Sequence, residues 1–200
     1  MNMAVLVAAP PEALVEVLPH KTWTRDEAAM LEQLGLLEGR HYELIDGEFI
    51  DKMGKLRPHV GGVHLTAEAL EAIFGKDRVN REAPIDVALS DNSTNEPEPD
   101  VIAFRCPWRG FTANPQPSDV ALLVEVADST IRHDTTTKAG LYARAGIVEY
   151  WVLDLNRRRL MVFRDSDGQA YQTRLEFDET QSICPLERPS NSVAVASLIP

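Results

Sequence analysis

Three consecutive segments decide the fold: Ala121-Leu-Leu-Val-Glu-Val-Ala127, a helical pattern over 135–145, and Glu149-Tyr-Trp-Val-Leu-Asp154. Apart from Glu125, the first segment is apolar throughout, which is typical of a strand that is covered on both faces. A strand, a helix of about eleven residues and a second strand fit a parallel crossover. We therefore expect an α/β protein (an α+β mixed sheet), with a central mixed β-sheet flanked by helices.

The segments before and after this crossover predict the remaining elements. Thr24-Arg-Asp-Glu27 is a capping box, which predicts a helix that runs to about Leu34. Two apolar runs around Asp46-Gly47 predict a β-hairpin over 42–50. Periodicity and turn residues further predict a helix over 58–75 and strands over 79–89, 100–104, 160–163 and 171–177.

The length of 200 residues fits one domain, at a prior of roughly 150 residues per domain. Residues 1–20 are rich in Ala, Val and Pro without a period and are expected to form a loosely ordered arm. Residues 21–180 are expected to form the domain, and 181–200 a C-terminal extension. The apolar segments 160–163 and 193–199 lie beyond the expected core and need cover, so we expect a homodimer.

The charge balance bears on the class of partner. Twenty basic and thirty-one acidic residues give a net charge of −11, which excludes a general basic surface for gripping nucleic acid. An acidic chain can still act on nucleic acid where a metal ion neutralises the site or where arginines are concentrated locally. Cys106 and Cys184 are too few for a disulfide framework, and the apolar stretch over 4–9 is too short for a membrane span. The expected location is the cytoplasm.

Glu125 is the charged residue in the middle of an apolar strand. An ionised carboxylate there costs several kcal/mol unless a cation compensates it. Either it lies at an exposed strand end or beside an arginine, or it binds a metal ion, as carboxylates on rigid strands can. Asp100 starts another strand directly after Glu96-Pro-Glu-Pro99. Alone it is typical of a turn, but it is also a candidate second ligand on an adjacent strand.

Lys138 and Glu43 complete the set of candidate site residues. Lys138 lies four residues after Asp134, so it either forms an ion pair on a solvated helix face or acts on water in a site. Of the twenty basic residues, fifteen are arginine and five are lysine. Lysine, unlike arginine, can have its pKa lowered enough to give up a proton. Glu43 either lies on the exposed face of the hairpin or joins the acidic group. His59 and His64 lack the spacing of a zinc helix motif.

Five motifs occur in register: Tyr42-Glu-Leu-Ile-Asp-Gly-Glu48, Pro97-Glu-Pro-Asp-Val101, Leu123-Val-Glu-Val-Ala-Asp-Ser129, Asp134 with Lys138, and Tyr142-Ala-Arg-Ala-Gly-Ile-Val-Glu-Tyr-Trp151. Over about residues 20–165 the chain resembles the Uma-two family of restriction endonucleases, a branch of the PD-(D/E)XK nuclease superfamily. The resemblance implies a restriction-endonuclease-like core and a magnesium-dependent phosphodiesterase site.

The resemblance also implies a role for each candidate residue. Asp100 matches the first metal ligand and Glu125 the acidic residue of the second half-motif. With the backbone carbonyl of Val126 they would hold Mg²⁺, for which Mn²⁺ can substitute. The lysine that normally follows this glutamate by two positions is absent, and Lys138 on the next helix takes its place. Glu43 matches an extra acid of the N-terminal hairpin.

The leading hypothesis is a metal-dependent endonuclease whose substrate is DNA. A binding or regulatory protein that keeps the nuclease fold without robust cleavage is an alternative from another class, and the net charge of −11 favours it. A hydrolase of smaller phosphodiesters is a third hypothesis, because it needs no basic surface. Plasmid nicking with Mg²⁺ or Mn²⁺ separates the first hypothesis from the second.

Overall fold

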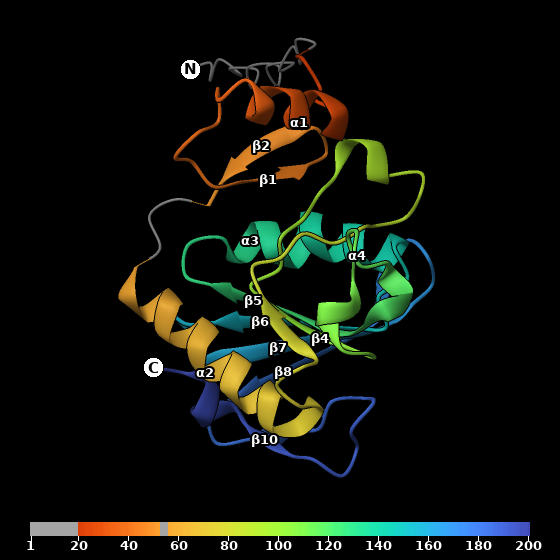
Figure 1. The fold of residues 1–200 in the computed structure, drawn as a ribbon. Helices are drawn as coiled ribbons and strands as arrows, with labels where there is room; N and C mark the ends of the chain where they lie inside the picture. Colours follow the sequence, from red (N-terminus) through yellow and green to blue (C-terminus); the bar gives the residue numbers. More distant parts are fainter. Residues whose placement is uncertain (1–19, 53–55) are drawn as a thin grey trace, which may run out of the picture.

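The computed structural model of the chain describes residues 20–52 and 56–200 and has a mixed α/β fold. The arm predicted over 1–20 lies, except for its last residue, outside the described residues. At the centre is a six-stranded sheet with the strand order β3-β4-β5-β6-β7-β8 (Figure 1). Its strands are β3 (Val79–Arg81), β4 (Val101–Phe104), β5 (Val120–Ala127), β6 (Glu149–Asp154), β7 (Arg159–Ser166) and β8 (Tyr171–Asp178). The predicted central mixed sheet is confirmed.

Strands β5 and β6 form the parallel pair of this sheet, and its other neighbouring strands are antiparallel. A helical segment connects them and packs on one face of the sheet, as a parallel crossover requires. The segment consists of α3 (Ile131–His133), a π-helical turn η4 (Asp134–Lys138) and α4 (Ala139–Arg144). The strand–helix–strand order read from the sequence is therefore confirmed.

Helices cover both faces of the sheet. Figure 1 shows α2 (Arg57–Phe74) on one face and α3 with α4 on the other. Helix α2 buries Ala67 and Leu70 against Trp151 of β6 in one core cluster, while α4 buries Tyr142 in a second cluster on the opposite face. No helix in the described ranges combines the length and the apolar composition that crossing a membrane requires.

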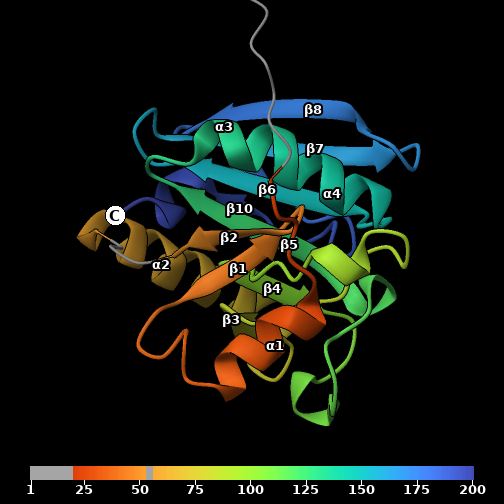
Figure 2. The same cartoon turned by 90° about the horizontal axis from the view of Figure 1, so that it is seen from above.

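A third layer lies over α3 and α4, on the side away from the sheet (Figures 1 and 2). The elements of this layer are α1 (Arg25–Gln33), β1 (Tyr42–Ile45) and β2 (Glu48–Asp51). Thr24 and Glu27 form the predicted capping box at the start of helix α1 in this layer. The predicted β-hairpin, formed by β1 and β2, turns at Asp46-Gly47. Ile45 of the hairpin packs against Leu141 of α4, which fixes the hairpin over the crossover.

The strand predicted over 79–89 is wrong beyond its first three residues. β3 ends at Arg81, because the next residue, Glu82, has a left-handed backbone with φ of 50°. Pro84 follows and has no N–H to donate to a sheet ladder. The N–H of Ile85 then donates to the carbonyl of Pro97 at 3.1 Å, so the chain crosses to the loop before β4.

The helix predicted over 135–145 begins four residues earlier, at Ile131. Asp134, which precedes the predicted helix, lies inside the helical segment, where its N–H donates to the carbonyl of Thr130 at 3.0 Å. The Thr135 and Thr136 hydroxyls also donate to carbonyls of the preceding turn. The correction matters because it places the π-helical turn, with Lys138 at its end, in the middle of the crossover.

The C-terminal residues complete the core under α2. Ile183, Val193, Val195 and Leu198 are buried with residues of α2 and of the sheet, within β9 (Ser182–Ile183), β10 (Val193–Ala194) and a short 3-10 helix η5 (Val195–Leu198). The four residues of 160–163 are also buried, on β7. The expectation that these two apolar segments need a second copy as cover is therefore wrong, because one chain covers both.

Candidate active site

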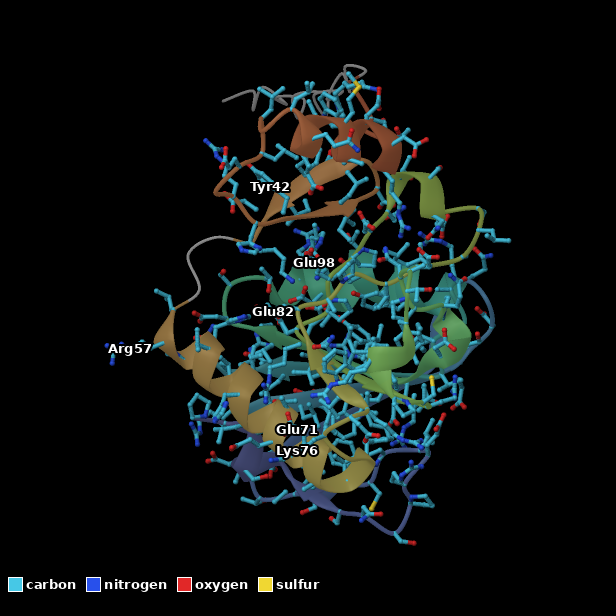
Figure 3. All side chains as sticks on the ribbon, in the orientation of Figure 1. Tyr42, Arg57, Glu71, Lys76, Glu82 and Glu98 are labelled. Carbon is cyan, nitrogen blue, oxygen red and sulfur yellow. The ribbon has the colours of Figure 1, made fainter. Side chains whose placement is uncertain are left out.

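A cleft of about 370 Å³ opens between the N-terminal hairpin, the start of α2 and the helical crossover. Figure 3 labels Glu82 and Glu98, which lie between the hairpin and α2 in that view. The cleft reaches down to the edge of the sheet, where β4 begins and β5 ends. The charged residues that line it include Glu43, Lys52, His59, Asp100, Glu125, Asp134 and Lys138.

Asp100 and Glu125 lie opposite each other at the floor of this cleft. The antiparallel register pairs Val101 of β4 with Val124 of β5, so the preceding Asp100 faces Glu125 across neighbouring strands. One oxygen of Asp100, Oδ2, accepts a hydrogen bond from the N–H of Val126 at 2.8 Å. That bond fixes the orientation of the carboxylate across two strands. The alternative that Asp100 is only a turn residue is therefore wrong.

Lys138 is buried between two carboxylates. Its Nζ lies 2.8 Å from Oε1 of Glu43 and 2.9 Å from Oε1 of Glu125. All three side chains are only 3–4% exposed, so an exposed hairpin face for Glu43 and a solvated helix face for Lys138 are wrong. An arginine partner for Glu125 is also wrong, because its cationic partner is Lys138. The π-helical turn that carries Lys138 is a distortion often found at functional sites.

The hydrogen bonds of Glu125 and Glu43 define which of their oxygens face the cleft. The hydroxyl of Tyr142 donates to Oε1 of Glu125 at 2.9 Å, the oxygen that Lys138 also contacts. Among the described residues both donors therefore meet Oε1, which leaves Oε2 as the oxygen for a cation. The N–H of Glu98 donates to Oε2 of Glu43 at 3.2 Å, so the hairpin acid is anchored to the loop before β4.

Burial and charge set different protonation equilibria for the two facing acids. Burial raises the pKa of Glu125 to about 8, against the opposing effect of Lys138. Burial would also raise the pKa of Asp100, but the adjacent imidazole of His59 and the positive charge of Lys52 lower it to about 2. Burial would lower the pKa of Lys138, but the surrounding carboxylates, Glu125 first, raise it. Lys138 therefore keeps its proton.

Two cleft residues beside Asp100 have no signal in the sequence pattern. His59 Nε2 lies 3.5 Å from Oδ1 of Asp100, and Lys52 Nζ lies 4.0 Å from the same oxygen. The position of His59 follows from helix packing: a Cβ on Gly62 would come within 2.9 Å of a Val126 methyl, so only glycine lets α2 approach β5 this closely. Such contacts depend on the tertiary fold, and the spacing of histidines in the sequence does not predict them.

A family model described as "Putative restriction endonuclease", Uma2, matches residues 28–196. The chain belongs to the Uma2 family. The motif resemblance to the Uma-two family is thereby confirmed, and membership indicates a restriction-type nuclease, a hydrolase that acts on nucleic acid.

Among solved structures, the chain is similar to one described as "a putative nuclease belonging to DUF820" from Anabaena variabilis ATCC 29413. The two have a TM-score of 0.61 and 16% sequence identity, and the match covers 78% of this chain and 88% of that chain. The search of curated proteins finds no match. At this identity the structural likeness shows a shared fold.

This Uma2 chain also has a compact group of side chains with metal-binding donor atoms next to the pair of facing acids. In the described ranges, one ligand atom each from His59, Glu82 and Asp100 lie within 4.8 Å of one another. Asp100 thus borders two acidic groups, one with Glu125 and one with His59 and Glu82. The donor set, carboxylate oxygens and an imidazole nitrogen, can hold a divalent metal ion.

The raised pKa of Glu125 predicts how the stability of the metal-free Uma2 protein varies with pH. A carboxyl whose pKa is 4.5 in the unfolded chain and about 8 in the folded one stabilises the fold fully below about pH 4.5, and this contribution is lost as the pH rises through 8. We expect denaturant melts in chelator to show stability falling over this window. In Glu125→Gln the free energy of unfolding should fall less steeply with pH. The same slope in variant and wild type would contradict a raised pKa for Glu125.

Proposed function

We propose that this protein is a metal-dependent endonuclease that hydrolyses phosphodiester bonds of DNA. The observation that carries the proposal is the convergence of Asp100, Glu125 and Lys138 in one cleft, with the lysine 2.9 Å from the glutamate. Two acids on neighbouring strands and one lysine are the parts that the family resemblance implies. The lysine reaches the site from the crossover helix instead of from the strand.

Asp100, Glu125 and the backbone carbonyl of Val126 would hold the metal ion. Oxygen donors of this kind suit Mg²⁺, with Mn²⁺ as a substitute. The charges of the cleft support this, because four buried acids, Glu43, Asp100, Glu125 and Asp134, lie around the ammonium groups of Lys138 and Lys52. When bound, a divalent ion supplies positive charge to the phosphate and lowers the pKa of water.

The residues of the cleft would orient the reactants around that ion. Glu43 and Glu125 hold the Nζ of Lys138 from two sides, so its remaining donor capacity is directed into the cleft. Because its pKa is raised, Lys138 is suited to orient the attacking water and to balance the negative charge that develops on the phosphate. We do not assign it the abstraction of a proton from water.

Supercoiled plasmid is the direct test of the proposal. We expect nicking in the presence of Mg²⁺ or Mn²⁺, none in chelator, and a loss of at least about 10²-fold in the Asp100→Asn variant. Glu176→Gln is the matched control, since this glutamate pairs with Arg159 on the exposed surface, and it should cleave like the wild type.

Two other outcomes would replace the proposal. Cleavage of a small chromogenic phosphodiester without any cleavage of DNA would make the protein a hydrolase of small phosphodiesters. Metal-dependent or metal-independent DNA binding without cleavage of either substrate would make it a binding protein with a nuclease fold. The net charge of −11 makes low ionic strength the right condition for both assays, since weak DNA contacts are lost in salt.

A homodimer remains a prediction that rests on the proposed reaction alone. Cutting both strands of a duplex by one kind of site calls for two copies of that site, and two-fold dimers are the commonest assembly. Light scattering at micromolar concentration is the measurement. A mass near the 22.2 kDa of one chain would contradict it.

A further inference from the structure

We propose that His59, Glu82 and Asp100 form a second divalent-cation site that selects Mn²⁺ over Mg²⁺. The inference rests on the proposed function in one respect, because Asp100 is shared with the first site. It adds a nitrogen ligand and a second ion to the nuclease centre described above. Neither His59 nor Glu82 belongs to the motifs that carry the family resemblance.

The separations of the ligand atoms fit one ion. Two ligands at about 2.1 Å from the same cation lie about 3 to 4.2 Å apart, depending on the angle between them. His59 Nε2 and Asp100 Oδ1 are 3.5 Å apart, and the whole group with Glu82 spans no more than 4.8 Å. A small rotation of the exposed Glu82 side chain would bring its carboxylate into range.

The two oxygens of Asp100 allow it to serve two sites. Oδ2 is fixed by the N–H of Val126 at 2.8 Å, on the side of β5 and Glu125. Oδ1 faces His59 and Lys52. A carboxylate held in this orientation presents different oxygens to the two groups.

The backbone around Glu82 holds this residue beside the same aspartate. Its N–H donates to the carbonyl of Pro99 at 3.1 Å and to that of Asp100 at 3.3 Å. Its φ of 50° is uncommon for a residue other than glycine, and it turns the chain out of β3 at this point. The hydrogen bonds therefore tie the two carboxylate-bearing segments together, and α2 brings His59 to them.

The imidazole determines which ion this site prefers. Mg²⁺ takes oxygen ligands and keeps several of its waters, whereas Mn²⁺, which also suits carboxylates, is a first-row transition metal that binds sites with mixed nitrogen and oxygen ligands. The ammonium of Lys52 donates to the carbonyl of Glu98 and lies 4.0 Å from Oδ1 of Asp100. A site with one nitrogen and two carboxylate ligands should therefore fill with Mn²⁺ before it fills with Mg²⁺.

Electron paramagnetic resonance of the full chain titrated with Mn²⁺ tests the proposal without requiring catalysis. We expect two bound ions, one of which carries nitrogen-14 couplings from a coordinated imidazole. His59→Gln should abolish the nitrogen couplings. Glu82→Gln should lower the affinity for the nitrogen-coupled ion by at least about tenfold, because even residues that only support a metal ligand usually contribute that much. Excess Mg²⁺ should displace the other ion first.

His64→Gln is the matched control, since this histidine lies on the same helix and is 62% exposed beside Glu68. It should leave the nitrogen couplings unchanged. Glu125→Gln should remove the ion without nitrogen couplings and keep the other one.

The outcomes separate this inference from the proposed function. A single Mn²⁺ without nitrogen couplings, lost in Glu125→Gln, would overturn the second site and leave the proposed nuclease centre intact. A single nitrogen-coupled Mn²⁺ that survives Glu125→Gln would support the His59 site and count against the first one. Absence of nitrogen couplings with two bound ions would also overturn the inference, whatever the nicking assay gives.

Discussion

Lys138→Arg is expected to lower the rate of plasmid nicking by about 10²-fold or more, as the loss of a positioned donor at a reacting centre usually does. The substitution keeps the positive charge and both ion-pair partners. However, Nζ of the lysine is enclosed between Glu43 and Glu125 at 2.8 and 2.9 Å. The larger, planar guanidinium would pair with these carboxylates through two nitrogens and would occupy the oxygen of Glu125 that is proposed to bind the metal ion. Initial rates of nicking under saturating Mg²⁺ are the measurement.

Lys21→Arg provides the control for this substitution, because Lys21 pairs with Glu27 at an exposed position. It should nick at the wild-type rate. Lys138→Met separates structure from catalysis: it leaves two buried carboxylates without their cation, so we expect a loss of about 3–5 kcal/mol of stability. Wild-type turnover in a correctly folded Lys138→Arg protein would limit Lys138 to a structural ion pair.

The second large effect is expected in the response of stability to metal. The wild type should gain about 2.7 kcal/mol when Mg²⁺ or Mn²⁺ is present at roughly 100 times its dissociation constant. Glu125→Gln should lose most of this gain in Mg²⁺. In chelator the variant should be as stable as the wild type or more stable by about 1 kcal/mol, because it removes a buried carboxyl while Lys138 keeps Glu43 as partner. Thermal melts in chelator and in millimolar metal measure both quantities.

Glu149→Gln is expected to behave in the opposite way. Glu149 is fully buried, pairs with Arg164 and accepts hydrogen bonds from Trp151 and from the N–H of Leu186. Removing its charge leaves the arginine without compensation, so this variant should be less stable in chelator and should respond to metal like the wild type. If Glu125→Gln showed the same pattern as Glu149→Gln, then Glu125 would be a structural acid and the proposed nuclease would lose its central residue.

The sequence predicts those parts of the fold that local signals determine. The capping box at Thr24 and the Asp46-Gly47 turn each depend on residues within a few positions of one another, and the structure confirms both. The crossover from β5 to β6 could be predicted because a nearly continuous apolar strand needs cover on both faces, and the structure confirms it. Glu125 is conspicuous for the same reason, since its charge contradicts the pattern of its own strand.

Features that depend on distant contacts could not be predicted in this way. Strand β3 ends before Glu82, whose N–H donates to carbonyls some seventeen positions later in the chain. The π-helical turn that directs Lys138 inward has no counterpart in helical periodicity, which assumes 3.6 residues per turn. His59 reaches Asp100 because α2 packs closely on β5 at Gly62, and spacing between histidines carries no information about that approach.

The ion pair between Glu43 and Lys138 joins a hairpin near the start of the chain to a helix far along it. Contacts of such long sequence separation are slow to form, because the intervening chain must first lose its freedom. Without the docked hairpin, Lys138 would lack one of its two carboxylate partners. The site proposed for the nuclease is therefore complete only when the hairpin has docked on the crossover helix.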